Sequence, residues 1–444
     1  MGSNELVVGE PRLGWFVDGN PDTEHVAVML RDTGTAIELQ VPLKDMYEDG
    51  DSYSRWFARG ISFGDDPGRT KYSYAPPRVV QFEDSSGTVT LVGCRAAGSW
   101  SNFNVGRGRI VANYAVLGGK SLRLEKINGL RTEIPALAAW TRLSNMTVDV
   151  QRDPQGLAQS VQMRLTNAPE IRLARPMNLT MKSSWQTSKD QGNFTAAEGV
   201  RTTTATKEPR SWDDHIAVHG AVLDLVSIAG WRPFGFSKIQ VNRADDPHRD
   251  GAGGNHGPKW SQVATHRLLK HEPWDRDPNF LFQYSEIGPR GIARWLRLRK
   301  EFGQAIGPLL NILRSEDQWS SSNVVQSGIA LEALGYLIDL ANGGANMNSR
   351  RQINFRPALQ VVLDDMRHHP FGDTTGWIDR ATDVYMSAKH PDRPQPDSLV
   401  ALNTLRENLL VLRYWVAQRL GARGKSMQRA LSRDPLYREW VALD

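Results

Sequence analysis

The chain has 444 residues, which is enough for two or three domains that each bury a core. Its hydrophobic fraction of 40% and charged fraction of 23% are typical of a soluble globular protein. The single cysteine, Cys94, excludes an intrachain disulfide and a cysteine-cluster zinc site, and the net charge of +5 is compatible with a nucleic-acid ligand without requiring one.

The sequence gives no indication of a membrane segment or an export signal. We find no apolar stretch that reaches the ~18 to 20 residues of a membrane helix. The opening residues MGSNELVVGEPR lack a basic start followed by an apolar region, and Leu6 stands where a myristoylation signal has Ser or Thr. Together with the lone cysteine, these features predict a cytoplasmic protein without a membrane partner.

Residues 1–284 predict a β-rich, mostly antiparallel region with a sandwich- or barrel-like fold. Short apolar or alternating runs between turn residues predict strands at 25–30, 36–43, 78–84, 88–94, 109–118, 146–151, 161–166, 171–182 and 236–242. The turn at 85–87 predicts a hairpin, and one helix is expected at His215–Ile228. The region is either one domain or two, because QRDPQG resembles a linker near 152–156.

The stretch ADDPHRDGAGGNHGPK at 244–259 is polar and rich in glycine. Two functional interpretations are a phosphate-binding loop and a histidine metal site. No Lys-Ser or Lys-Thr pair follows the glycines, and the nearby histidines do not share the i,i+4 spacing of ligands on one helix. We therefore expect a surface loop here, and neither a metal ion nor a cofactor.

From residue 285 to 444 the apolar pattern changes to the 3.6-residue period of helices. Apolar stripes predict helices at 289–314, 323–340, 357–369, 375–390 and 397–420, and a shorter one at 435–443. Asp397 is expected to cap the start of the fifth helix and Gly421 to follow its end, while His368 and His369 are expected to end the third. The whole chain is therefore expected to be an α+β protein, with an all-α helical bundle as its second domain.

The stretch KHPDRPQPD at 389–397 places Lys389 and His390 where a helix should end. A histidine exchanges protons readily near neutral pH, and a neighbouring lysine supplies a fixed positive charge. These are the groups that RNA cleavage without a metal needs: a base, an acid and a cation that stabilises the phosphate. The alternative interpretation is structural, because basic residues commonly end helices by complementing the helix dipole.

Several stretches resemble the ApeA-like anti-phage abortive-infection family. They are GTVTLVGC at 87–94, INGLRTEIPALAAW at 127–140, GIALEALGYLI at 328–338 and KHPDRPQPD. The order of a β-rich domain and then a helical bundle also resembles this family, whose bundle is of the HEPN type. The resemblance implies a metal-independent endoribonuclease with a 2′,3′-cyclic phosphate product, an RNA substrate, a phage-encoded trigger protein and a homodimer or higher homo-oligomer. It also implies that the β-rich region senses the trigger or regulates the bundle.

One part of the family pattern is missing. HEPN ribonucleases carry an Arg four to six residues before the His, whereas Val384, Tyr385 and Met386 stand there in this chain. We therefore assign the acid/base role to His390 and phosphate stabilisation to Lys389, with Arg393 in support. The missing Arg also leaves open a second function, in which the bundle is a non-catalytic binding or dimerisation module and the β-rich domain binds a phage or host protein.

The remaining candidates support this site or bind RNA. Asp383 lies on nearly the same helix face as His390 and either orients the imidazole or is a solvated acid. Glu332 either holds a cation of the site or forms a structural ion pair. A basic stripe on the first helix either follows an RNA backbone or is a solvated face; it consists of Arg290, Arg294 and Arg297.

Overall fold

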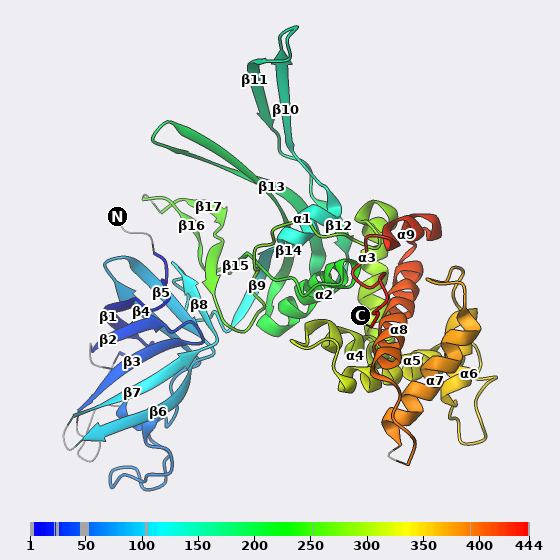
Figure 1. Ribbon diagram of the computed structural model, residues 1–444. Coiled ribbons are helices and arrows are strands. Elements are labelled where there is room, and N and C mark those ends of the chain that lie inside the picture. The colour runs from blue at the N-terminus through cyan, green and yellow to red at the C-terminus, as the bar shows by residue number, and fades with distance from the viewer. Residues whose placement is uncertain are drawn as a thin grey trace. The chain divides into compact units, whose positions relative to one another are not determined.

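The computed structural model describes residues 4–21, 23, 26–44, 53–102, 105–251, 253–390 and 392–442 (Figure 1). The chain forms two compact units, and each is built from three chain segments. The first unit comprises residues 1–133, 201–217 and 236–271, and the second comprises 134–200, 218–235 and 272–444. Strand β14 (Asn193–Ser211) and helix α2 (Trp212–Gly230) each continue from one unit into the other. The expected domain boundary at 284/285 stays a prediction.

The first unit is an antiparallel β structure. Within it the strand order is β14-β9-β15-β18-β8-β5-β4-β1-β2-β3-β7-β6. The strands are β1 (Pro11–Val17), β2 (Ala27–Asp32), β3 (Ile37–Lys44), β4 (Val79–Asp84), β5 (Gly87–Val92), β6 (Arg95–Asn102), β7 (Val105–Ala112), β8 (Tyr114–Leu117), β9 (Lys126–Glu133), β15 (Lys238–Asn242) and β18 (Ser261–Ala264). The expected hairpin at 85–87 is confirmed, since Asp84 pairs with Gly87.

Alternation of apolar and polar residues explains why this sheet has one buried face. In β2, Val28 and Leu30 are buried while the residues beside them face solvent. One core cluster contains residues of β5 and of β7, although four strands separate these two in the sheet order. The sheet therefore curves around this first core cluster, to which the short 3-10 helix η1 (Ser54–Phe57) adds Trp56.

The beginning of α2 covers a second core cluster of the first unit. Trp212 stacks on Tyr114 with 4.1 Å between ring centroids, and its indole Nε1 donates to Leu124 O. His215 is fully buried one turn later. Its Nδ1 lies 2.7 Å from Thr204 Oγ1 and its Nε2 lies 3.3 Å from Ile127 O. The helix expected at 215–228 is thus confirmed and is longer at both ends.

Two regions expected to be a loop and a linker are parts of β-hairpins. The glycine-rich stretch includes a small hairpin of β16 (Pro247–Arg249) and β17 (Asn255–Pro258). In the second unit, residues 152–156, considered above as a linker, form the turn between β10 (Met146–Arg152) and β11 (Ala158–Leu165). This hairpin projects upward in Figure 1. The unit also contains α1 (Pro135–Thr141), β12 (Ile171–Ala174), the 3-10 helix η2 (Pro176–Asn178) and β13 (Leu179–Asp190).

The helices of the second unit form a bundle. They are α3 (Tyr284–Glu301), α4 (Gly303–Arg314), α5 (Ser321–Ala341), α6 (Phe355–Asp364), α7 (Thr374–Lys389), α8 (Ser398–Leu420) and α9 (Gly424–Leu431). Three expectations were wrong. The helix expected at 289–314 is two helices, because the backbone leaves the helical region at Phe302. The third helix already ends at Asp364, and the final short helix is α9 rather than a helix at 435–443.

Helix α5 is central to this bundle and contacts α4, α6, α7 and α8. It is long and apolar enough to cross a membrane by length and composition alone, which the sequence analysis did not notice. Half of its apolar window is buried inside the protein. The apolar character of α5 is therefore explained by its position in the core of the bundle.

Candidate functional site

The end of α7 carries the lysine-histidine pair. Asp373 caps the start of this helix by accepting a hydrogen bond from Gly376 N at 2.9 Å. The last helical residue is Lys389, and His390 has an extended backbone with φ −118° and ψ 111°. The residue before a proline disfavours the helical conformation, so Pro391 explains this end point. Lys389 is therefore exposed at the helix end and His390 lies half-buried beside it.

Tyr385 connects Lys389 to Glu332 of α5. Its buried ring lies 5.3 Å from Lys389 Nζ, which is within the range of a cation–π contact. Its hydroxyl donates to Glu332 Oε2 at 2.9 Å. Burial and this carboxylate raise the pKa of Tyr385, so the phenol stays protonated and remains a donor. Glu332 was expected either to hold a cation of the site or to form a structural ion pair. It instead accepts a hydrogen bond from Tyr385, whose ring contacts Lys389.

Packing fixes the position of Tyr385. Its ring lies against Phe355 with 4.3 Å between centroids, and it covers Gly328 of α5. A Cβ atom at Gly328 would lie 2.2 Å from the tyrosine ring, so only glycine permits this approach. Side chains of α5 and α6 therefore fix the Tyr385 ring of α7, which is the ring that Lys389 contacts.

Arg393 and Asp383 are both exposed near this helix end. Arg393 N donates to His390 O at 3.1 Å, which forms a turn directly after the helix. Asp383 precedes His390 by seven residues, or about 10 Å along the helix axis. Within the described ranges neither carboxylate oxygen of Asp383 bonds to the imidazole.

Arg380 is the arginine on α7 that precedes His390 most closely, and its charge is already satisfied. Its Nη2 lies 2.9 Å from Glu407 Oε1 of α8 and its Nη1 lies 3.3 Å from Asp373 Oδ2. Ten residues separate it from His390, which is about 15 Å along the helix. Arg380 therefore joins α7 to α8 and does not supply the cation that HEPN ribonucleases place beside their histidine.

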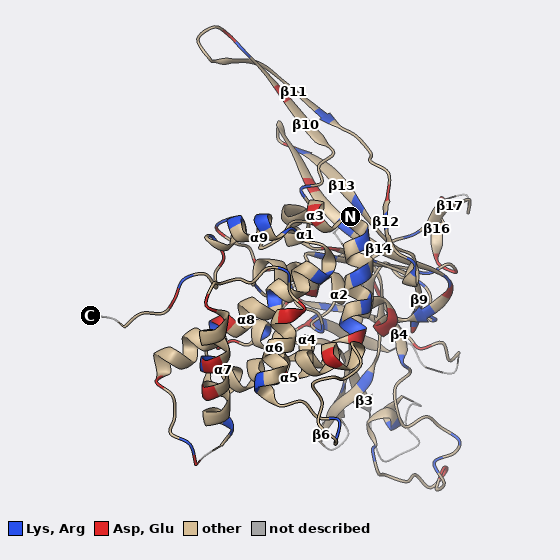
Figure 2. Cartoon of the chain, turned by 90° about the vertical axis from the view of Figure 1, so that its right-hand side faces the viewer, with Lys and Arg blue, Asp and Glu red and all other residues tan. Residues whose placement is uncertain are grey.

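A second basic site, which we call the basic pocket, lies elsewhere in the same unit. It has a volume of about 1280 Å³. Its basic lining residues are Arg294, Arg297, Arg367, His368, Arg419, Arg423 and Lys425, and its acidic lining residues are Glu301 and Asp365. These side chains come from α3, from α8, from the segment that follows α6, and from the beginning of α9. Figure 2 shows basic residues of α9 in blue.

The structure divides the expected RNA-binding stripe. Arg294 and Arg297 line the basic pocket, whereas Arg290 is exposed one turn earlier on α3 and does not line it. His368, expected only to end a helix, is also part of the lining. The other basic residues of the pocket were not predicted from the sequence because each stands near a helix end, where a solvated charge is the ordinary interpretation.

Comparison with known proteins gives one family. The family described as ApeA N-terminal domain 1 matches residues 11–295, which is well over half of the chain. The chain belongs to this ApeA family. No curated protein and no solved structure matches it. The ApeA resemblance inferred from short stretches is thereby confirmed, and it places the chain among anti-phage defence proteins.

The ApeA match covers all of the first unit's strands and ends inside α3. It therefore includes the β10–β11 hairpin of the second unit and the whole of α2. Residues 296–444, which hold the end of α7 and most of the basic pocket, lie beyond the matched range. What these helices do has to be argued from their own side chains.

Proposed function

We propose that this ApeA protein limits phage infection by cutting RNA without a metal ion, with His390 and Lys389 as the catalytic residues. The observation that carries the proposal is the arrangement at the end of α7, where Tyr385 and Glu332 hold the ammonium group of Lys389, the residue directly before His390. A cation kept in place on the residue that precedes a histidine suits phosphodiester chemistry. The first unit, in this proposal, senses a phage-encoded trigger protein or regulates the bundle.

The reaction needs three transfers. A base, His390, removes the proton of the 2′-hydroxyl, whose oxygen attacks the adjacent phosphorus. Lys389 stabilises the negative charge that develops on the phosphate oxygens. The bond to the 5′-oxygen breaks, and that oxygen takes a proton from an acid. The products are a 2′,3′-cyclic phosphate end and a 5′-hydroxyl end.

The acid requires a second titratable group or a second copy of the chain. Arg393 supplies another cation three residues after His390, but a guanidinium group is not suited to act as a general acid. A homodimer that brings two α7 ends around one phosphate would provide two imidazoles, one as base and one as acid. The proposal therefore includes a homodimer or higher homo-oligomer that acts in the cytoplasm on RNA.

The test is RNA integrity in cells after phage challenge, with wild-type chain or His390→Ala. Loss of one general acid–base group typically costs about 10² to 10⁴ in rate, so fragmentation should disappear in the variant. The matched control is His248→Ala, an exposed histidine of the first unit, which should leave fragmentation unchanged. Fragments with 3′-hydroxyl ends that require magnesium would contradict the mechanism.

One observation favours the second function, a non-catalytic binding module. The positions four to six residues before His390 hold Val384, Tyr385 and Met386, and Arg380, earlier on α7, is engaged by Glu407 and Asp373. Helix α7 therefore offers no free arginine of the kind that the HEPN pattern uses. In that case His390→Ala and Lys389→Ala would both leave phage resistance and cellular RNA intact. The same comparison of variants therefore distinguishes the two functions.

A further inference from the structure

The basic pocket carries more positive charge than its own carboxylates can neutralise. Six Arg and Lys side chains line it, against Glu301 and Asp365. Asp365 is already engaged, because its Oδ1 accepts from Arg419 Nη2 at 2.9 Å and its Oδ2 accepts from Trp415 Nε1 at 2.8 Å. Most of the remaining charge is therefore left to interact with solvent or with an anionic ligand.

The walls of the pocket are fixed by hydrogen bonds. Gln418 of α8 accepts from the backbone N of Arg367 and of His368 at 3.0 and 3.1 Å, and donates to His368 O at 2.7 Å. Arg294 Nη1 donates to Arg419 O at 3.1 Å. The segment after α6 is thus held against α8, and α3 is held to the end of α8.

The beginning of α9 closes against the same wall. A Cβ atom at Gly424 would lie 2.1 Å from the ring of His368, so the close approach of these segments depends on glycine at this position. Arg423 is held by its backbone N, which donates to Glu286 Oε2 at 3.1 Å. This leaves its guanidinium exposed at the pocket.

Four side chains remain available to a ligand. They are Arg297, Arg367, Arg423 and Lys425, all exposed. In the part of the chain that the structure describes, their charged ends have neither an ion pair nor a hydrogen bond. Guanidinium groups bind phosphate with two parallel hydrogen bonds, and several of them on one wall suit an anion with repeated phosphates.

The size of the pocket favours a polymer over a single small molecule. Its volume of about 1280 Å³ exceeds the ~300 to 1,000 Å³ of pockets that hold one small ligand. A nucleic-acid strand presents one charged phosphate per nucleotide, and its affinity comes largely from such contacts.

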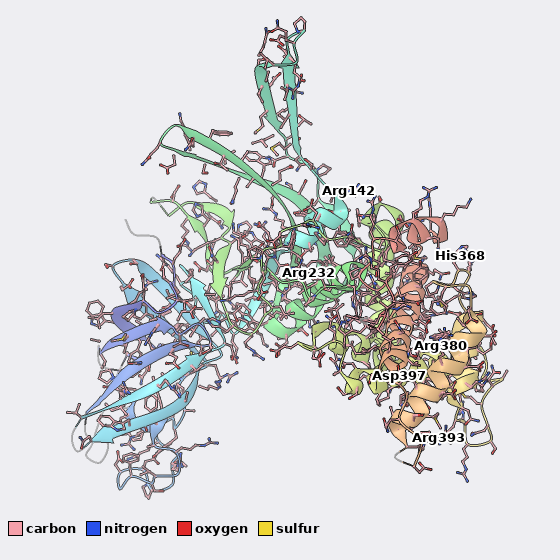
Figure 3. The ribbon with its side chains drawn as sticks, viewed as in Figure 1. Arg142, Arg232, His368, Arg380, Arg393 and Asp397 are labelled. Carbon is pink, nitrogen blue, oxygen red and sulfur yellow. The ribbon has the colours of Figure 1, made fainter. Side chains whose placement is uncertain are left out.

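We propose that the basic pocket binds the phosphodiester backbone of the RNA strand that the protein acts on. This assignment rests on the proposed function, since that function supplies the RNA. His368 and Arg393 lie toward opposite ends of α7 in Figure 3. The helix has 16 residues and spans about 24 Å, so the pocket holds a part of the strand distant from Lys389. The pocket therefore contributes to binding and not to the chemical step.

The experiment measures binding of a fluorescent 12-nucleotide oligouridylate, 2′-O-methylated so that it cannot be cleaved, to the full chain at several KCl concentrations. The variant is Arg297→Ala with Arg367→Ala. Each lost phosphate contact lowers the slope of log K against log[salt] by about 0.7 for a single strand, so the pair should lower it by about 1.4. This change of slope corresponds to roughly 25-fold weaker binding at 0.1 M salt.

The control is Arg350→Ala with Arg438→Ala, which removes two exposed arginines of the same unit outside the pocket. It should keep the wild-type slope and affinity. Equal slopes for the pocket variant and the wild type would overturn the assignment. ATP and inorganic phosphate serve as competitors. If either displaced the labelled oligomer at the same concentration as the unlabelled 12-mer, the pocket would be a site for a small phosphate ligand, and the assignment to an RNA strand would be overturned.

The two proposals fail in different ways. Pocket-dependent binding of the oligomer without RNA cleavage would refute the nuclease and keep the pocket assignment. Cleavage of unmodified RNA with the same KM in the pocket variant would refute the pocket assignment and keep the nuclease. The expected result is a raised KM in the pocket variant and a lowered kcat in His390→Ala.

Discussion

Arg413 and Asp434 form a fully buried ion pair in the second unit. The guanidinium makes two hydrogen bonds to the carboxylate, at 2.7 and 2.9 Å. It also donates to the carbonyl oxygens of Ile228 and Ala229 at the end of α2. One side chain of α8 thereby holds three segments together, and its hydrogen bonds offset the cost of removing two charges from water.

Replacing Arg413 with Met should destabilise the second unit strongly. The Asp434 carboxylate would keep the backbone N of Leu436 as a donor but lose both hydrogen bonds to the guanidinium, and two buried carbonyl groups would lose it as well. Breaking such a pair costs about 3 to 5 kcal/mol. Urea unfolding followed by circular dichroism measures this as a shift of the transition midpoint. Adding Asp434→Leu should recover part of the loss, because no unpaired carboxylate then remains. A midpoint unchanged by Arg413→Met would show that the pair contributes nothing.

His215 should make the first unit sensitive to acid. Burial lowers the pKa of this histidine, against smaller opposing effects of the Ile127 carbonyl and of Asp214. An unfolded histidine takes up a proton as the pH falls through about 6.5, while the folded one stays neutral until a lower pH. The unfolded state then binds more protons, so the free energy of unfolding should fall as the pH drops below about 6.5.

The sole cysteine provides the measurement. Cys94 lies in the core of the first unit, where burial raises its pKa to about 12, so it is protonated and inaccessible until that unit opens. A short pulse of thiol reagent at increasing urea concentration reports the unfolding midpoint at pH 5 and at pH 7. His215→Gln, which removes the titrating group, should reduce the difference between the two midpoints. An equal difference in the variant would assign the acid sensitivity to other groups.

At the scale of elements, α8 is defined by its two ends. Asp397 Oδ1 accepts from Leu399 N and Val400 N at 2.9 and 3.1 Å, and Gly421 ends the helix with a φ of 103°. Asp397→Ala should cost about 1 kcal/mol, as N-cap losses usually do, and Asp397→Ser should restore most of it. Thermal unfolding of the three proteins measures the difference. A loss with Ser as large as with Ala would mean that the charge of Asp397, and not its hydrogen bonds, is what matters.

The presence or absence of clear end signals explains which helices could be predicted from the sequence. Helices α7 and α8 were predicted within one or two residues because capping residues and an apolar period coincide there. The division between α3 and α4 at Phe302 was missed because the apolar stripe continues across it. Helix α9 was missed because its sequence GKSMQRAL buries only Met427 and Leu431, which leaves almost no period to detect.

The candidate site was predictable only in part, for a physical reason. Lys389 and His390 are neighbours in the sequence, so their proximity needs no fold. The contact of Tyr385 with Glu332 joins two helices, and the basic pocket gathers charges from segments more than 100 residues apart. Such groups of residues form only through tertiary packing. A single charged residue near a helix end does not indicate in the sequence which other residues it will lie beside.

At the scale of the whole molecule, the helical bundle depends on chain that precedes it. Residues 218–235, which include α2 from Val218 to its end at Gly230, belong to the second unit. Trp295 Nε1 of α3 donates to Ala221 O at 2.6 Å, and Arg299 lies 2.7 Å from the buried Asp224. Together with the contacts of Arg413, these bonds make α2 part of the core around which α3 and α8 pack.

A fragment of residues 285–444 should therefore fail to form a native core. It contains α4 to α9 and most of α3 but lacks α2, so Trp295 Nε1 would lose its acceptor, Ala221 O. Arg413 would keep Asp434 but lose the carbonyl oxygens of Ile228 and Ala229. Each buried donor left without an acceptor costs about 1 to 3 kcal/mol. We expect helical far-ultraviolet circular dichroism without a cooperative thermal transition in the near ultraviolet. A fragment of residues 134–444 retains every segment of the second unit and should show that transition. Cooperative unfolding of the shorter fragment would instead support a domain boundary at residue 284, with α2 serving only as a cover over a bundle that folds by itself.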